Sequence, residues 1–176
     1  MKLARIGSPG SEKPVIVNQD GTLRDVSGLL NDITPECLSD AAISVLRSID
    51  TSQLPIITGT PRYGPPVSGV GKFIAIGLNY LDHAEETNMP VPKEPIVFSK
   101  ATTCIQGPND AIMLPRGLEK TDWEVELGVV IGRRARYVEK DVALDYVAGY
   151  CTVNDISERA FQLERGSQWD KGKGCD

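Results

Sequence analysis

The sequence predicts an α+β fold in which most of the regular structure is β. Three observations lead to this class. Short runs rich in β-branched and aromatic residues recur along the chain, turn-forming residues separate them, and helical spacing is confined to a few short segments. The 176 residues suffice for one well-cored domain, or for a core with a small appendage.

The first part of the chain has the pattern of a small α+β module. A short alternating strand opens it, and two further strand-like runs flank Asp20-Gly21, a dipeptide that favours a hairpin turn. Thr34 and Pro35 then begin a predicted helix, as N-cap and first helical residue, and this helix continues to about Ser48. The module therefore combines a hairpin with one helix.

The stretch 51–71 is dense in proline and glycine and has the composition of a connector. We therefore predict a small N-terminal domain with its linker over residues 1–66 and a catalytic domain over residues 67–176. In the second domain, strands are predicted at residues 73–77, 96–99, 121–131 and 146–154, and helices at 80–87, with Asn79 as N-cap, and 156–165.

Composition excludes several classes of function. A formal net charge of −5 and a pI near 5.0 argue against a nucleic-acid partner. No apolar run approaches the length of a membrane span, and the first residues lack the apolar segment of a secretory signal. The four cysteines are far apart and form no C-x-x-C pair, which favours reduced thiols and a cytoplasmic location.

The stretch Thr121–Ile131, T-D-W-E-V-E-L-G-V-V-I, places two acids in an otherwise apolar strand. Alternate strand residues share a face, so Glu124 and Glu126 should point the same way, with Cα atoms about 6.6 Å apart. At about 5 Å and an effective dielectric of about 20, their carboxylates repel by about 3 kcal/mol. Solvent, a basic partner, a shared proton or a divalent cation could neutralise them. The simplest interpretation is a hydrated acidic face.

His83 is the only histidine and the first candidate for a general base near neutral pH. On a helix, Glu86 lies three residues further along the same face and could fix the imidazole tautomer. The alternative is a surface histidine beside the acidic residues Asp82, Glu85 and Glu86.

Asp155 ends a predicted strand and could serve in two ways. A third carboxylate there could complete an oxygen site with Glu124 and Glu126, leaving positions for water and substrate, as Mg²⁺ prefers. Asp155-x-x-Glu158 also has the spacing of a capping box at a strand-to-helix junction. The roles are compatible, because a carboxylate has several lone pairs.

Two further polar residues follow Asp155. Gln162 lies one or two helical turns on and could aim its amide at the same site, or it could face solvent. Lys173 lies in K-G-K-G-C-D, a glycine-rich segment that could bring backbone close to a ligand. The alternative for that segment is a flexible basic tail.

Together, the motifs of the second domain resemble the fumarylacetoacetate hydrolase family. They occur in the family's order from Phe73 to Asp176: G-L-N-Y-L-D-H-A-E-E, P-I-V-F-S-K, D-W-E-V-E-L-G-V-V-I-G, D-Y-V-A-G-Y-C-T-V-N-D-I-S-E-R, F-Q and K-G-C-D. The leading module resembles the small first domain of bacterial members. The G-L-N-Y form is most similar to members described as ureidoglycolate lyases or 2-hydroxyhepta-2,4-diene-1,7-dioate isomerases.

The resemblance implies a mixed β-roll or sandwich around a Mg²⁺ or Mn²⁺ ion, usually in a homodimer. It also implies roles for eight residues: metal ligands at Glu124, Glu126 and Asp155, a dyad on a mobile lid at His83 and Glu86, oxyanion stabilisation and substrate binding at Gln162 and Lys173, and a frequently present lysine, here assigned to substrate binding, at Lys100.

The expected function is that of a metal-dependent hydrolase or lyase acting on a small 2-oxo acid or related carboxylate. Stabilisation of an enolate would serve an acylpyruvase, an isomerase, a decarboxylase or a ureidoglycolate lyase. Family members continue beyond the K-G-x-D motif, so a chain that ends at Asp176 is expected to expose unpaired strand edges and to be poorly active. Two alternatives are a metal-binding module without turnover and an interaction domain with a solvated acidic strand.

Overall fold

The structure is a computed structural model that describes residues 1–166 and 168–175. Its contacts divide the chain into two compact units. The first unit contains residues 1–70, 106–111 and 125–153, and the second contains residues 71–105, 112–124 and the chain from Asn154 onwards. Short strands and short helices alternate throughout, which confirms the predicted α+β class. Within the described ranges, no helix has the length and apolar character needed to cross a membrane. The domain division at residue 66 stays a prediction.

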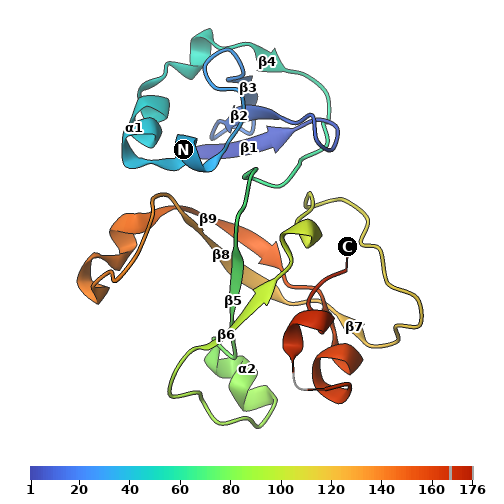
Figure 1. The fold of residues 1–176 in the computed structure, drawn as a ribbon. Helices are drawn as coiled ribbons and strands as arrows, with labels where there is room; N and C mark the ends of the chain where they lie inside the picture. Colours follow the sequence, from blue (N-terminus) through green and yellow to red (C-terminus); the bar gives the residue numbers. More distant parts are fainter. Residues whose placement is uncertain (167, 176) are drawn as a thin grey trace. The chain divides into compact units, whose positions relative to one another are not determined.

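The N-terminal part of the first unit is a four-stranded antiparallel sheet with the order β1-β2-β3-β4 (Figure 1). Its core contains Ile6, Val15 and Leu23. The predicted turn is confirmed, because the Gly21 N–H donates to the Asn18 carbonyl and Gly21 has a φ of 85°. The strands are β1 (Lys2–Ile6), β2 (Lys13–Val17), β3 (Leu23–Asp25) and β4 (Ile56–Ile57).

The helix predicted from Thr34 to Ser48 is two elements, so its predicted continuity is wrong, although the first element does begin at Pro35 after Thr34. A 3₁₀ turn, η1 (Pro35–Leu38), precedes the α-helix α1 (Asp40–Ser48). Ser39 between them is extended, and its side chain accepts from the Ala42 N–H, whereas Thr34 makes no side-chain cap. A hydroxyl that satisfies an N–H of the first helical turn resets the N-terminus at Ser39. A second 3₁₀ turn, η2 (Thr51–Gln53), follows.

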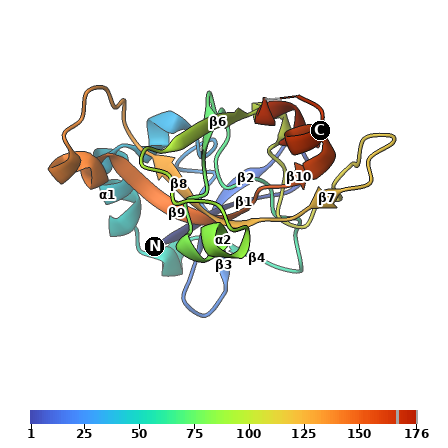
Figure 2. The same cartoon turned by 90° about the horizontal axis from the view of Figure 1, so that it is seen from below.

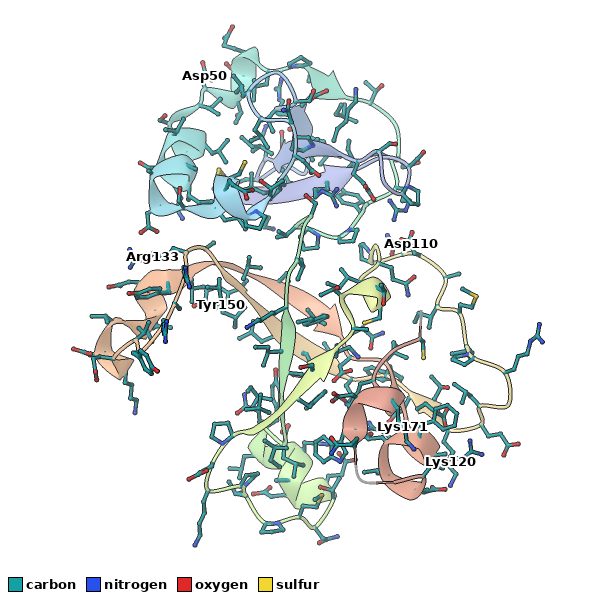
Figure 3. The ribbon with its side chains drawn as sticks, viewed as in Figure 1. Asp50, Asp110, Lys120, Arg133, Tyr150 and Lys171 are labelled. Carbon is teal, nitrogen blue, oxygen red and sulfur yellow. The ribbon has the colours of Figure 1, made fainter. Side chains whose placement is uncertain are left out.

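The first unit also contains most of a two-stranded ribbon, β8 (Val125–Ile131) with β9 (Val147–Asn154), joined through the 3₁₀ turn η4 (Lys140–Tyr146). Exposure alternates along β8, as expected for a strand. Tyr150 projects from β9 and is exposed (Figure 3). The exposed face of β8 is apolar and consists of Val125, Leu127, Val129 and Ile131.

The second unit is built on an antiparallel hairpin of β5 (Phe73–Gly77) and β6 (Ile96–Lys100), with α2 (Leu81–Glu86) between them in sequence (Figure 1). The predicted cap at Asn79 is wrong, because Tyr80 is the N-cap and makes no side-chain capping bond to the helix, while Asp82 accepts from the His83 N–H at 2.9 Å. The short strands β7 (Thr121–Asp122) and β10 (Ser157–Glu158) pair beside the C-terminal turns (Figure 2). The C-terminal turns are the π-type η5 (Ala160–Glu164) and the 3₁₀ η6 (Trp169–Gly172). The second unit also contains the 3₁₀ turn η3 (Thr102–Cys104), which follows β6.

Candidate active site

A cluster of opposite charges lies inside the second unit. Three of its members are almost fully buried, with Asp155 4%, Lys100 6% and Lys173 3% exposed. Buried charges are stable only when they are paired and hydrogen-bonded, so this cluster must satisfy itself. It contains three acids, Asp122, Glu124 and Asp155, and three bases, Lys100, Arg159 and Lys173.

Glu124 lies in a break between β7 and β8, so the predicted continuous strand Thr121–Ile131 is wrong. The Glu124 N–H donates to the Asn154 side-chain oxygen at 3.2 Å, and its carbonyl accepts from the Asp155 N–H at 2.8 Å. These bonds interrupt the strand because they take up the backbone groups of Glu124. They also fix Glu124 beside Asp155, which brings the two carboxylates into one site.

Lys173 joins the two carboxylates. Its Nζ lies 2.8 Å from Glu124 Oε2 and 3.0 Å from Asp155 Oδ2. Two carboxylate oxygens from separate segments therefore converge on one position, and a cation occupies that position. Lys173 is not part of a flexible basic tail, since the 3₁₀ turn η6 ends beside it and its side chain is buried.

Lys100 holds Asp155 from the other side. Its Nζ lies 2.5 Å from Asp155 Oδ1 and also donates to the backbone carbonyl of Lys173. The lysines Lys120 and Lys171, by contrast, are exposed at the C-terminal turns (Figure 3). The geometry of Lys100 therefore orients a carboxylate and ties β6 to the segment that carries Lys173.

Arg159 completes the cluster, and sequence reasoning gave it no role. Its guanidinium lies 2.5 Å from Glu124 Oε1 and 2.8 Å from Asp122 Oδ2. The hydrogen bond from Arg159 lowers the pKa of Asp122, although burial opposes this shift. Burial also opposes the charge of Arg159, but the bonds from Asp122 and Glu124 outweigh it and raise the pKa of the guanidinium. Only its position in D-I-S-E-R, four residues after Asp155, could have indicated Arg159.

Gln162 is buried, so the solvent-facing alternative is wrong. Its Oε1 accepts from Arg159 at 3.0 Å. The amide oxygen accepts this bond, so the bond fixes which end of the amide faces Arg159. The π-type turn η5 carries this side chain inward.

The predicted capping box is also wrong. Glu158 ends the short strand β10, and the following turn has Arg159 as its N-cap. The Glu158 carboxylate accepts from the Lys120 N–H, the Thr121 hydroxyl at 2.8 Å and the Ala160 N–H. Pairing of β10 with β7 thus replaces the first turn of the predicted helix, and the carboxylate of Glu158 supports this pairing.

In the part of the chain that the structure describes, two predicted site residues take no part in the charge cluster, and a third, Glu126, belongs to the other unit. His83 and Glu86 are on α2, half-buried and exposed respectively, and the ion pairs and hydrogen bonds of the cluster found among the described residues include neither. Glu126 is half-buried on β8 and belongs to the first unit. The dyad and the third ligand stay predictions.

Two basic side chains, Arg159 and Lys173, contact Glu124 and neutralise its charge. In the described part of the chain, no three His, Cys, Asp or Glu side chains gather as a metal site. Nevertheless, the oxygens of Glu124 and Asp155 already converge on a cation, Lys173 Nζ. Hard oxygen donors of this kind suit a hard divalent ion, so this part of the site fits one.

Comparisons with known proteins identify the family. Residues 72–176 match the family described as fumarylacetoacetate (FAA) hydrolase, C-terminal. Proteins of Burkholderia cenocepacia and Burkholderia multivorans, each named only as a hydrolase, are 60% identical to this chain over all 176 residues. The chain spans 62% of the length of these relatives.

Solved structures have the same fold. A fumarylacetoacetate hydrolase from psychrophilic Exiguobacterium antarcticum is 27% identical, with a TM-score of 0.80 over 100% of this chain and 62% of its own. A 5-carboxymethyl-2-hydroxymuconate delta-isomerase from Mycobacterium smegmatis is 30% identical, with a TM-score of 0.69 over 100% of this chain and 62% of its own. From the matched family and the converging carboxylates together, we conclude that the chain belongs to the fumarylacetoacetate hydrolase family.

Proposed function

We propose that this chain carries the site of a metal-dependent enzyme that acts on a small 2-oxo acid or a related carboxylate. One observation carries the proposal: oxygens of Glu124 and Asp155, from separate segments, lie 2.8 and 3.0 Å from a single cation in a buried site. Lys173 balances these two carboxylates here, and a divalent ion would take up the same oxygens when it binds.

Glu124 and Asp155, with Glu126 as the third ligand, would hold Mg²⁺ or Mn²⁺. When bound, the ion supplies a Lewis acid that polarises a substrate oxygen and orients the substrate. The ligands are carboxylate oxygens, which suit these hard cations. Family membership supports a divalent metal in general, and the choice between the two ions is part of the proposal.

Lys173 and Gln162 would stabilise the oxyanion or enolate oxygen of the substrate. The Lys173 ammonium has three donors, and Gln162 keeps its two amide N–H groups because Arg159 occupies its oxygen. A positioned donor of this kind contributes about 3–4 kcal/mol to transition-state stabilisation. Lys100 would assist binding by holding Asp155 in place.

His83, oriented by Glu86, would move the proton. Their helix α2 begins and ends near residues with left-handed backbones, since Leu78 has a φ of 48° and Asn88 a φ of 54°. At Asn88 this is the ordinary end of a helix, because the Asn88 and Met89 N–H groups donate to the Glu85 and Ala84 carbonyls. Leu78 has a conformation that non-glycine residues rarely adopt and that occurs at functional and switch regions. We therefore propose that α2 is a lid, with Leu78 as its hinge.

The reaction itself is tested by a substrate screen. Acylpyruvates, oxaloacetate and ureidoglycolate are incubated with the protein and Mg²⁺ or Mn²⁺, and product is followed by absorbance. We expect cleavage of a 2-oxo acid, and we expect this activity to be lost when the metal is chelated. Stoichiometric metal binding without turnover would instead indicate a binding module, and absence of both would indicate an interaction domain.

Isomerisation is the second candidate. It is favoured by the structural similarity to a 2-hydroxyhepta-2,4-diene-1,7-dioate isomerase from Mycobacterium marinum, which is 28% identical with a TM-score of 0.65. An isomerase shifts a proton and needs the same stabilised enolate oxygen, so the same residues would serve it.

We also propose a homodimer, which light scattering of the purified protein tests directly.

A further inference from the structure

The Lys173 ammonium has an aromatic wall on one side. Its Nζ lies 5.0 Å from the centroid of the Phe98 ring, which is within the range of a cation–π contact. Trp169 meets Phe98 edge-to-face, with ring centroids 5.6 Å apart and planes inclined by 68°. Edge-to-face contact is a favourable arrangement for two rings, so Trp169 holds the Phe98 ring in place.

One face of β6 contacts both ends of Lys173. Phe98 and Lys100 are two residues apart on this strand and therefore share a face. Phe98 contacts the ammonium, and Lys100 donates to the Lys173 backbone carbonyl. The strand thus fixes both the backbone and the head group of Lys173.

The other partners of the ammonium are the carboxylates of Glu124 and Asp155. These are the oxygens that a divalent ion would use, so the ion would compete with Lys173 for them. The Phe98 ring has no such competitor, because a π face does not attract Mg²⁺ away from carboxylate oxygens. It is the contact that can keep Lys173 in place when the carboxylates are engaged.

The geometry points to Phe98, braced by Trp169, as a positioning residue that holds the Lys173 ammonium beside the carboxylates. This inference rests on the proposed function for the catalytic role of Lys173, but the contact itself can be measured without turnover. Its consequence is that a ring, and not merely apolar volume, is required at position 98.

The test is amine labelling of the whole chain with a lysine-specific reagent, with and without Mg²⁺, followed by peptide mass spectrometry. Labelling of Lys173 is measured relative to the exposed Lys93 in the wild type, Phe98→Tyr and Phe98→Met. Methionine keeps similar apolar volume but no ring. The matched control is Phe161→Met, because the Phe161 ring lies 4.8 Å from Arg165 and that pair does not include Lys173.

We expect Lys173 labelling in Phe98→Met to rise by about threefold to tenfold, with the larger effect in Mg²⁺, and to stay unchanged in Phe98→Tyr and Phe161→Met. Trp169→Leu keeps the Phe98 ring but removes the ring that packs against it, so Lys173 labelling should rise by less. This variant replaces Phe98→Met as the test if Phe98→Met does not fold. Equal Lys173 labelling in the wild type and in the folded variants would overturn the inference.

Activity measurements separate this inference from the proposed function. On the substrate found in the screen, Phe98→Met should lower kcat more than it changes KM, and Phe98→Tyr should keep the kcat of the wild type. Full activity of Lys173→Met would overturn the catalytic role of Lys173, whatever the labelling result. Unchanged labelling in Phe98→Met would overturn the role of Phe98, whatever its activity.

Discussion

Lys100 and Asp155 form a buried ion pair in which Nζ lies 2.5 Å from Oδ1, with side chains 5% and 6% exposed. The second carboxylate oxygen of Asp155 is left for Lys173. This division orients Asp155 toward the proposed metal position. Lys100 on β6 fixes one carboxylate oxygen, and the other faces the Lys173 ammonium, which also contacts Glu124. Stability and function of the second unit therefore depend on the same contact.

Replacing Lys100 by methionine should destabilise the protein by about 3 kcal/mol, because the buried Asp155 carboxylate loses one of its two basic partners and keeps only Lys173. Urea unfolding followed by circular dichroism measures the change. The matched control is Lys93→Met, an exposed lysine before β6 that should change stability little. Equal losses in the two variants would show that the buried pair has no special role.

Gly172→Ala should displace the segment that carries Lys173. A Cβ at this position would lie 2.6 Å from the Gln162 backbone nitrogen and 2.8 Å from the Glu158 carbonyl oxygen, and neither backbone atom can turn away. We expect a loss of about 1–3 kcal/mol in the free energy of unfolding. Gly71→Ala is the control, since nothing lies within 4 Å of its Cβ. Unaltered thermal stability of Gly172→Ala would contradict this packing.

Gln162→Leu should lower kcat by about 10²–10³-fold while sparing metal binding, because the amide donates to substrate and not to the ion. Steady-state kinetics and metal titration are measured on the same preparation. Arg159→Lys is the companion variant: it keeps the charge but lacks the guanidinium N–H that donates to Gln162, so the amide loses its fixed orientation. A Gln162→Leu variant with full kcat would remove this residue from the mechanism.

An ion network in the first unit predicts sensitivity to acid. Arg62 pairs with Glu12 at 3.0 Å and with Asp110 at 2.5 Å. Burial would raise the pKa of Glu12, but the hydrogen bond from Arg62 and the charges of Arg5 and Arg62 outweigh it and hold the pKa below its ordinary 4.5. The bond from Arg62 likewise lowers the pKa of Asp110 below 3.8.

These two pKa values are lower in the folded chain than in the unfolded chain. Both carboxylates therefore stabilise the fold above their ordinary pKa values, and this stabilisation is lost as the pH falls through the lowered values. Unfolding free energies measured from pH 7 to pH 3 should decline below about pH 4.5. Arg62→Met should be less stable at pH 7 and show a shallower decline, whereas Arg133→Met, which removes the exposed pair with Asp40, should behave as the wild type. Identical slopes in the wild type and Arg62→Met would refute this assignment.

The sequence predicted the fold class, because turn residues and alternating apolar runs are local patterns that locate strands. It also singled out residues that the structure brings together: Glu124 from the acidic motif, Asp155 from the end of a strand and Lys173 from a glycine-rich segment. The family resemblance added Lys100. Residues whose role depends on a single neighbour in space, such as Phe98 and Trp169, carried no local signal.

The errors have a common physical cause. The strand breaks at Glu124 because its backbone bonds to Asn154 and Asp155, some 30 residues away. The capping box at Asp155 fails because Glu158 pairs with the strand at Thr121 instead of beginning a helix. In each case a distant partner overrides a local preference, which the order of residues alone does not contain.

We propose that Glu124, Glu126 and Asp155 together hold one divalent ion. Isothermal titration calorimetry with Mg²⁺ and with Mn²⁺ measures this binding on the wild type and on Glu124→Gln, Glu126→Gln and Asp155→Asn, with Glu139→Gln as an acidic control. We predict one ion per chain in the wild type and the control, and loss of binding in the three variants while their circular dichroism spectra stay native. Stoichiometric binding that survives all three substitutions, or no binding by the wild type, would contradict the claim.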